Sequence, residues 1–345
     1  MLQSIFLLSS VTRFLIIQTA FLGDVVLATA LVEKLHSFFP DAKIDFLLRK
    51  GNESILANNP KLHKVHVWDK SSKKFSNLLK VATAVRRQRY DCVINVHRGV
   101  NSGFITWFSK AKDKRGFEKN PFQWCYTERF LHSFSKREDK HFIHEVERNQ
   151  QLIASLTDEV PAKPGMYPSE ADFQRIQPYL GQEFVCIAPS SVWFTKRFPP
   201  ERWVELIKLL PSKFKIFLLG AKEDEPLAQQ IMQDAGQERV SNLCGKLSIM
   251  QSAALMSRAA MNYTNDSGPM HFASAVNAPT TVVYCSTHPC FGFGPLADYS
   301  RVVQVEGLYC KPCGLHGFAT CPEGHFRCAK DLKINELLWW ISPTT

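Results

Sequence analysis

The chain has 345 residues, of which 45% are hydrophobic and 21% are charged, and this composition is typical of a folded globular protein with room for two domains. It excludes a disordered or fibrous chain. The formal net charge of +10 favours acidic partners such as phosphates, nucleotides or an anionic membrane surface, without fixing the fold.

The first apolar stretch, residues 14–32, carries a single charge, Asp24, so a membrane span has to be weighed. An aspartate near the centre of a span costs about 2.5 to 3.5 kcal/mol, and residues 1–11 contain no lysine or arginine. We therefore favour a buried strand at 13–18 and a helix at 25–39. Asp24 then lies in the turn between them. Residues 1–10 are expected to add at most one further strand.

Strands and helices alternate through the rest of the first half. We predict strands at 43–48, 64–68 and 91–97, a short helix near residue 53, and a longer helix at 74–88. This order is typical of a parallel sheet with crossover helices. A proline-containing stretch at 160–168 then predicts a domain boundary between about residues 161 and 183.

The second half repeats the pattern. We predict strands at 184–188, 215–219, 260–264 and 280–284, and helices at 200–210, 223–235, 249–258 and 270–275. The fold class is therefore α/β, with two Rossmann-like domains whose parallel sheets face each other across a central cleft. We expect an N-terminal domain at 1–170, a C-terminal domain at 183–330 and a terminal helix at 331–345. Ligands should bind at the carboxyl ends of the strands.

Two loops at strand ends in the second half carry residues suited to phosphate binding. "NDSGPMH", residues 265–271, opens a helix whose amides and positive dipole end favour an anion; Asp266 and Ser267 could instead simply cap it. The other loop, "PSSVWFTKRF", residues 189–198, combines hydroxyl groups with Lys196 and suits a pyrophosphate, or is a solvated basic loop. The predicted donor residues are Ser190, Thr195, Lys196, Asp266, Ser267, Gly268 and His271.

A third loop, "GAKEDE" at 220–225, places carboxylates after the next strand. Asp224 or Glu223 could accept hydrogen bonds from ribose hydroxyls, or could stabilise the start of the following helix. The sequence has neither a G-x-G-x-x-G after its first strand nor a P-loop, which disfavours both dinucleotide and P-loop sites. We therefore assign the nucleotide to the second domain.

In the first domain, Asp24 stands in an apolar turn where partial loss of water raises the basicity of a carboxylate. It could accept a proton from a substrate hydroxyl, or cap the helix at Val25, and the two roles are compatible. Arg98, after the strand ending at His97, is the predicted contact for an anionic acceptor, with Arg49 and Lys50 as weaker candidates.

The stretches "TAFLGDVVLATALV", "SSVWFTKRFPPERWVELIKLL" and "YTNDSGPMHFASAVNAPTTVVY" together resemble glycosyltransferase family 9, the ADP-heptose:lipopolysaccharide heptosyltransferases. The resemblance extends to "VHRGVNSGFITWFSKAKDKRGF" and "HEVERNQQLI" and so spans nearly the whole chain. Its most specific element is the T-N-D-S-G-P-M-H run.

The resemblance implies a GT-B fold and an inverting, metal-independent transfer of heptose from ADP-heptose to the lipid A-core acceptor. It implies that Asp24 is the general base, that Lys196 is at the donor phosphates, and that Asp266, Ser267, Gly268 and His271 form the donor loop. It also implies a cytoplasmic enzyme associated peripherally with the inner membrane, and no nucleic-acid partner. Alternatives are a relative that uses another nucleotide sugar, and a non-catalytic protein that binds nucleotide sugars or glycans.

Four of the ten cysteines lie close together near the C-terminus, in the segment that we call the cysteine segment, residues 310–328. Four thiolates could hold a structural zinc, and His325 could replace one of them, but the second half lacks the usual close pairing. Reduced thiols or a disulfide are the alternatives. The ligands of this candidate zinc site are Cys310, Cys313, Cys321 and Cys328.

Overall fold

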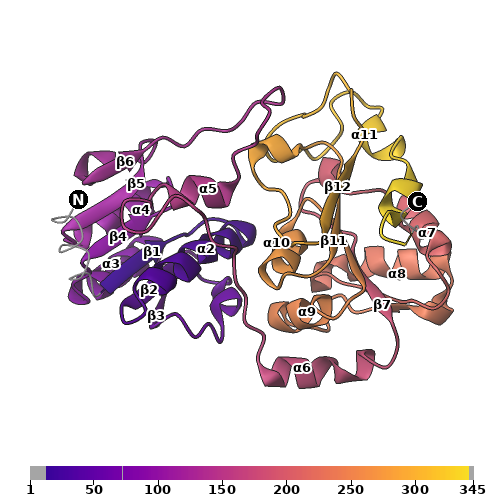
Figure 1. Cartoon of the computed structure of the whole chain (residues 1–345), viewed down its shortest axis with the longest axis horizontal. Coiled ribbons are helices and arrows are strands. Elements are labelled where there is room, and N and C mark those ends of the chain that lie inside the picture. Colours follow the sequence, from indigo (N-terminus) through magenta and orange to yellow (C-terminus); the bar gives the residue numbers. More distant parts are fainter. Residues whose placement is uncertain (1–12, 72, 342–345) are drawn as a thin grey trace. The chain divides into compact units, whose positions relative to one another are not determined.

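A computed structural model describes residues 13–71 and 73–341. The chain divides into two compact units, shown in Figure 1. The N-terminal unit holds residues up to 134 together with 143–167, and the C-terminal unit holds 135–142 together with the chain from 168 onward. The division therefore falls at Tyr167–Pro168, and the short segment 135–142 belongs to the second unit.

The N-terminal unit is built on a six-stranded sheet in the order β3-β2-β1-β4-β5-β6, and every neighbouring pair is parallel. The central strands are short, fully buried apolar runs, as expected when both faces of a parallel sheet are covered. The strands are β1 (Arg13–Ile17), β2 (Lys43–Arg49), β3 (Lys64–Trp68), β4 (Cys92–Asn95), β5 (Asp113–Phe117) and β6 (Glu128–Phe130).

The helices of this unit pack along the sheet and bury its apolar side chains. One cluster joins Leu15 and Ile17 of β1 to Val81 and Val85 of α3 and to Ile105 of α4. The helices are α2 (Leu22–Phe38), α3 (Lys74–Arg87), α4 (Val100–Phe108) and α5 (Glu145–Gln150), with 3₁₀ turns η1 (Glu53–Leu56) and η2 (Gln123–Cys125).

The C-terminal unit repeats the topology, with the parallel order β12-β11-β10-β7-β8-β9. Its strands are β7 (Phe184–Ala188), β8 (Lys215–Leu218), β9 (Val240–Asn242), β10 (Met261–Asn265), β11 (Thr280–Tyr284) and β12 (Ser300–Gln304). Its helices are α6 (Glu170–Ile176), α7 (Pro200–Leu209), α8 (Glu225–Ala235), α9 (Ile249–Met256), α10 (Gly268–Ala275) and α11 (Arg327–Lys330), and its 3₁₀ turns include η4 (Phe194–Lys196), η5 (Lys222–Asp224), η7 (Pro289–Phe291) and η8 (Ile334–Leu338).

Successive residues of β11 show how this second sheet is covered on both faces. Val283 packs into the large core cluster that includes Trp203 of α7 and Ile231 of α8. Val282, one residue earlier, packs with Met270 of α10 in a separate cluster. Because successive strand residues point to opposite faces, helices must lie on both sides of the sheet. Figure 1 labels α7, α8, α9 and α10 in this unit.

The α/β class and the two Rossmann-like sheets are confirmed, because both sheets have the 3-2-1-4-5-6 strand order of the doubly wound fold. The predicted strands at 184–188 and 280–284 match β7 and β11 residue for residue. The peripheral strands β5, β6, β9 and β12 were not predicted. Residues 1–10, for which the sequence allows at most one further strand, lie outside the described residues.

Two predicted helix positions differ from the structure. Helix α2 begins at Leu22, three residues before the predicted start, so Asp24 is in its first turn and is not the residue before it. The predicted terminal helix at 331–345 is, over the described residues, the short 3₁₀ turn η8. Trp339 Nε1 donates to Thr281 Oγ1 (2.9 Å) and Trp340 Nε1 donates to the Tyr263 hydroxyl (2.8 Å), so this end packs on the C-terminal unit.

None of the helices in the described part of the chain combines the length and the apolar composition needed to cross a membrane.

Candidate active site

The predicted site residues follow the two strand pairs at which the strand order of each sheet reverses. In the N-terminal unit, Asp24 follows β1 and Arg98 follows β4, and these strands are neighbours. In the C-terminal unit, Lys196 follows β7 and Asp266 follows β10, which are also neighbours. In doubly wound folds, ligands bind at this switch point, outside the carboxyl ends of the strands. Each unit therefore carries its candidate residues where its topology favours a ligand.

The loop of residues 189–198, which we call the lysine loop, is tied to the end of β10 by Asn265. The buried Asn265 amide donates to the Pro189 carbonyl (2.8 Å), and its side-chain oxygen accepts from the Phe198 N–H (3.0 Å). One side chain thus joins both ends of the lysine loop. Asn265 belongs to the "NDSGPMH" motif, but the sequence alone gave it no role. Its position at the end of the central strand β10 could have indicated one.

Lys196 is held by an ion pair with Asp266. The Lys196 Nζ atom lies 2.7 Å from Asp266 Oδ2, and the Thr287 hydroxyl donates to the same carboxylate oxygen (2.6 Å). Both members of the ion pair are largely buried. Because an ammonium group has three donors, a pair with one carboxylate leaves others for a ligand oxygen. Thr287, after β11, is a further site residue that the sequence analysis missed.

Helix α10 opens at Gly268 with no side-chain cap at Ser267. The Ser267 hydroxyl instead donates to the Asn265 carbonyl (3.4 Å), and Asp266 is engaged by Lys196 and Thr287. The alternative in which Asp266 and Ser267 only cap this helix is therefore not what the structure shows. His271 lies in the first turns of α10 and is buried.

The other predicted donor residues have different surroundings. Thr195 is fully buried, and its hydroxyl is hydrogen-bonded to other protein groups. It is therefore not exposed to contact a ligand directly, although its neighbour Lys196 is a candidate contact. Ser190 is partly exposed at the end of β7. Asp224 accepts a hydrogen bond from the Ala221 N–H (2.9 Å) at the start of η5, which is the helix-stabilising alternative considered for this loop. Glu223 beside it is exposed.

Asp24 lies in the first turn of α2, where its carboxylate accepts the Phe21 N–H (3.1 Å). Burial and the negative charge of Glu145 raise the pKa of Asp24 to about 6, although the Phe21 N–H and the Arg98 cation act in the opposite direction. A carboxylate with this pKa is ionised at neutral pH and is more basic than an ordinary aspartate. Asp24 therefore stabilises the start of α2 and stays a candidate general base.

Glu145, at the start of α5, is the carboxylate that influences Asp24. It is buried, and its side chain bonds Arg148 Nε (2.8 Å) and His132 Nε2 (3.2 Å). Burial acts to raise the pKa of Glu145, but His132 and Arg148 lower it overall, so this side chain stays ionised. A partly buried carboxylate with a raised pKa and a buried one with a lowered pKa thus lie in one unit. Glu145 was not predicted, because its link to Asp24 depends on the packing of α5 against α2.

Three cations gather near Asp24 at the carboxyl ends of β2, β3 and β4. Lys70 Nζ donates to the Thr19 carbonyl (3.0 Å), and the Arg49 guanidinium lies 5.2 Å from the Phe21 ring centroid. Burial, Lys70, Arg98 and Arg49 together lower the pKa of His97 to about 4. Lys50 instead pairs with Asp69 (2.8 Å).

These cations are suited to an anionic ligand. Within the described residues, no carboxylate lies within ion-pair distance of Arg49, Lys70 or Arg98. Their positive charges are therefore available to an anionic ligand. The structure thus brings together the predicted Arg98 and Arg49. Lys70 was missed, although its position just after a strand was a usable signal.

The cysteine segment gathers its thiols without a defined metal site. Cys310 Sγ lies 4.0 Å from His325 Nε2, and all ten cysteines are free. In the part of the chain that the structure describes, no group of three or more histidine, cysteine, aspartate or glutamate side chains is arranged to hold a metal ion. Zinc binding by the four cysteines therefore stays a prediction, which metal analysis of the purified protein would check.

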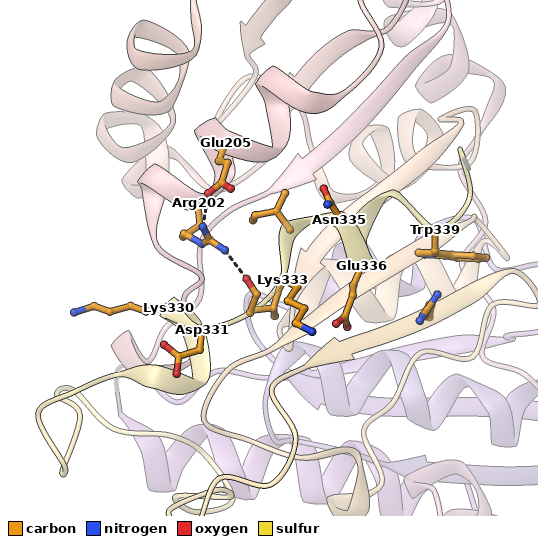
Figure 2. Close-up of a pocket in the computed structure, with 11 residues that line it drawn as sticks. Arg202, Glu205, Lys330, Asp331, Lys333, Asn335, Glu336 and Trp339 are labelled. Atoms are coloured by element: carbon orange, nitrogen blue, oxygen red, sulfur yellow. Dashed lines mark hydrogen bonds and ion pairs between the residues drawn. The ribbon is translucent and has the colours of Figure 1, made fainter. Parts of the chain in front are cut away.

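A surface groove on the C-terminal unit contains none of the predicted site residues. It is formed by the first turns of α7, by Arg301 and by the chain from 330 to 339. Figure 2 shows Arg202 reaching toward Glu205 on one side and toward the backbone near Lys333 on the other, where it donates to the Leu332 carbonyl. Glu205 thus neutralises the charge of Arg202, the cation at the centre of this groove. We therefore do not assign the substrate site to the groove.

Two Rossmann-like units, each with a parallel six-stranded sheet, give the chain an α/β fold of the GT-B class. The family model for glycosyltransferase family 9 (heptosyltransferase) matches residues 78–318, and the chain belongs to this family.

Individual relatives agree with this assignment. The chain is 26% identical over 321 residues to lipooligosaccharide heptosyltransferase 2 of Haemophilus influenzae, covering 86% of this chain and 89% of the relative. Its fold is similar to that of E. coli ADP-heptose LPS heptosyltransferase II, with a TM-score of 0.76, 20% identity and coverage of 95% and 97% of the two chains. It is also similar to E. coli heptosyltransferase WaaC solved with ADP, with a TM-score of 0.73, 22% identity and coverage of 95% and 98%.

Proposed function

We propose that this protein transfers heptose from ADP-heptose to the inner core of lipopolysaccharide, with inversion at the anomeric carbon and with Asp24 as the general base. Membership of a heptosyltransferase family supports the transferred sugar. The names of the relatives, which include ADP-heptose and lipopolysaccharide or lipooligosaccharide, support the donor and the acceptor. The observation that carries the proposal is the Asp24 carboxylate, partly buried at the switch point of its sheet with a pKa of about 6.

The reaction is a single displacement. The acceptor hydroxyl oxygen forms a bond to the anomeric carbon of heptose while the bond from that carbon to the ADP oxygen breaks. The proton of the hydroxyl passes to Asp24, and the electron pair of the broken bond leaves with ADP. Attack from the face opposite the leaving group inverts the anomeric centre, and no covalent sugar–enzyme intermediate is needed.

The donor diphosphate is proposed to bind between the lysine loop and the start of α10. Lys196, held by Asp266, offers its remaining N–H groups to phosphate oxygens, and the N-terminus of α10 at Gly268 adds its positive dipole end. Both features stabilise the negative charge that grows on ADP as it departs. They can supply the positive charge that a metal supplies in other transferases, so we propose that transfer proceeds without added divalent metal.

The acceptor is proposed to bind in the N-terminal unit, where Arg49, Lys70 and Arg98 present their charges near Asp24. The anionic groups of a lipopolysaccharide core are suitable partners for such a cluster.

We propose a peripheral position at the cytoplasmic face of the inner membrane, and an exposed aromatic cluster on the same unit supports contact with a membrane surface. Trp107 of α4 lies 6.5 Å from Trp124 of η2, between ring centroids, and the two side chains are 42% and 65% exposed. The exposed Lys110 and Lys112 follow α4 directly, and the exposed Lys119 precedes η2. Tryptophan beside lysine is typical of surfaces that bind the interface of an anionic bilayer.

Release of ADP by the purified protein tests the donor and acceptor together. We expect release from ADP-heptose only when a heptose-deficient lipopolysaccharide is added, and we expect it to persist in EDTA. Release from a different nucleotide sugar in preference to ADP-heptose would point to a relative with another donor. Binding of ADP without any release would instead support a non-catalytic protein and would contradict the proposal.

A further inference from the structure

The cysteine segment contacts the lysine loop directly, although neither the fold nor the proposed chemistry requires it to do so. The Thr195 N–H donates to the Phe318 carbonyl (3.1 Å), and the Phe318 N–H donates to Thr195 Oγ1 (2.8 Å). This reciprocal pair joins residues that are 123 positions apart in the sequence. The two segments are therefore fixed to each other immediately beside Lys196.

A second segment, the chain that follows β11, completes the environment of Thr195. The Ser286 hydroxyl donates to Thr195 Oγ1 (2.9 Å), and the Ser286 N–H donates to the Thr195 carbonyl (3.2 Å). The Ser286 carbonyl in turn accepts the Cys313 N–H (2.9 Å). The cysteine segment is thus attached at Cys313 to the exit of β11 and at Phe318 to the lysine loop.

Gly317 explains how the cysteine segment can come so close. Its φ of +81° lies in the left-handed region, which favours glycine. A Cβ atom built on it would lie 3.0 Å from Lys196 Cγ and 3.0 Å from Thr195 Oγ1. The backbone at Gly317 therefore packs against the aliphatic stem of Lys196 itself, as well as against its neighbour.

Both ends of the cysteine segment are anchored in the core of the C-terminal unit. Cys328 is buried in the large core cluster, and Cys310 and Cys321 pack against it. Lys311 is also buried, with Nζ donating to the Tyr284 carbonyl at the end of β11 (2.8 Å). The part that touches Lys196 is thus connected to a rigid base and has little freedom to follow a displaced lysine.

We propose that Thr195 is a positioning residue for Lys196, and that residues 313–318 of the cysteine segment act with Ser286 to hold the ammonium group in place against Asp266. The Thr195 hydroxyl receives hydrogen bonds from both segments, so it links them at the lysine. The segment that carries the cysteines is then part of the donor site's support. This inference rests on the proposed role of Lys196 at the donor phosphates.

The test compares two substitutions at Thr195. Thr195→Val keeps the shape of the side chain but removes the hydroxyl, which leaves the Phe318 N–H and the Ser286 hydroxyl without their buried acceptor. Thr195→Ser keeps the hydroxyl. We expect Thr195→Val to raise the KM for ADP-heptose and the Kd for ADP by about five- to tenfold, and Thr195→Ser to restore both to within about twofold of the wild type.

A matched control separates positioning from a general loss of stability. Thr281→Val also removes a buried hydroxyl, one that bonds Trp339 and lies away from the lysine loop. We expect it to lower the melting temperature without changing the KM for ADP-heptose. Gly317→Ala should act like Thr195→Val, since its methyl group meets the Lys196 stem. A Thr195→Val variant that loses stability but keeps wild-type donor binding, beside a Lys196→Ala variant that binds ADP weakly, would overturn the proposal.

The positioning role of Thr195 can still be tested if Lys196 has no role in donor binding. In that case Lys196→Ala would bind ADP normally, and the proposed function of Lys196 would fail by itself. A crystal structure of Thr195→Val would then decide the positioning role. A Lys196 Nζ atom displaced from Asp266 would support it, and a contact kept at the 2.7 Å of the wild type would contradict it.

Discussion

At the scale of single residues, the proposed mechanism depends on how the pKa of Asp24 is set. Burial raises this pKa most, and Glu145 adds to the shift, to give a value of about 6. Asp24 is then ionised and able to accept a proton above pH 6, and becomes protonated below it. We expect kcat/KM to fall on the acid side of about pH 6 for this reason.

The Glu145→Gln variant tests the second of these causes. Removal of a negative charge makes ionisation of Asp24 easier, so its pKa should fall and the acid limb of the pH–rate profile should move to lower pH. Glu147→Gln is the matched control: it removes a carboxylate of the same helix whose side chain accepts the His144 N–H, and it should leave the limb in place. Because Glu145 is buried with Arg148, thermal unfolding of the variant should be measured alongside. An unchanged acid limb in Glu145→Gln would show that Glu145 has no influence on the base.

Candidate site residues were easiest to name where they follow a central strand, as Asp24, Lys196 and Asp266 do. The strand and the polar residue after it are both visible in one short stretch of sequence. Glu145 and Ser286 could not be assigned in the same way. Their roles arise from contacts between distant segments, which a single sequence does not display.

At the scale of secondary-structure elements, a buried polar network links β2, β3 and Tyr90, which lies two residues before β4. The Tyr90 hydroxyl donates to Asp45, and His66 Nε2 lies 2.8 Å from the same hydroxyl. His63 Nδ1 bonds the other Asp45 oxygen (2.8 Å). Burial acts to raise the pKa of Asp45, but these three partners lower it overall.

Tyr90→Phe should therefore destabilise the protein by about 1 to 3 kcal/mol, because it removes a donor from a buried carboxylate. Denaturant unfolding near pH 7 measures this difference. The depressed pKa of Asp45 means that its stabilising effect is present above the pKa of an unfolded aspartate and is lost as the pH falls through its lower folded value. The difference between variant and wild type should accordingly shrink in acid. Equal stability of the two proteins at neutral pH would contradict this account.

Elements were predictable in proportion to their burial. The central strands β1, β7, β10 and β11 are buried along all or nearly all of their length, and their positions were predicted closely. The edge strand β6 is three residues long with the sequence "ERF", and β5 begins with three charged residues, "DKR". Such strands are defined by pairing with a neighbour and not by their own composition, so hydrophobic pattern alone could not find them.

At the scale of the whole molecule, the net charge of +10 and the aromatic cluster around Trp107 and Trp124 predict binding to anionic membranes. We expect co-sedimentation with phosphatidylglycerol-containing vesicles at low salt and much weaker binding at high salt. The double substitution Trp107→Ser and Trp124→Ser should reduce binding several-fold. Phe75→Ser, which removes a side chain that is 79% exposed and is not part of the cluster, is the control. Equal binding by the double variant and the wild type would rule out this surface.

The topology of the whole chain was predictable because the same order of strands and helices occurs in both units. Each unit repeats the same alternation and places its polar loops after the same strands, so the residue pattern of one unit supports the interpretation of the other. The course of the chain at 135–142 was not predictable. Arg137 Nη1 of this segment donates to the Lys311 carbonyl (2.9 Å), and its charged, loop-like sequence gives no sign of where it packs.

The most direct test of the central claim compares wild-type protein with Asp24→Asn. The substitution keeps the size of the side chain but removes the basic oxygen, so acceptor-dependent release of ADP from ADP-heptose should be abolished. ADP binding, measured by calorimetry on the same samples, should stay within a few-fold of the wild type, since the donor residues Lys196 and Asp266 are unchanged. Transfer by Asp24→Asn at the wild-type rate would contradict the assignment of Asp24 as the general base.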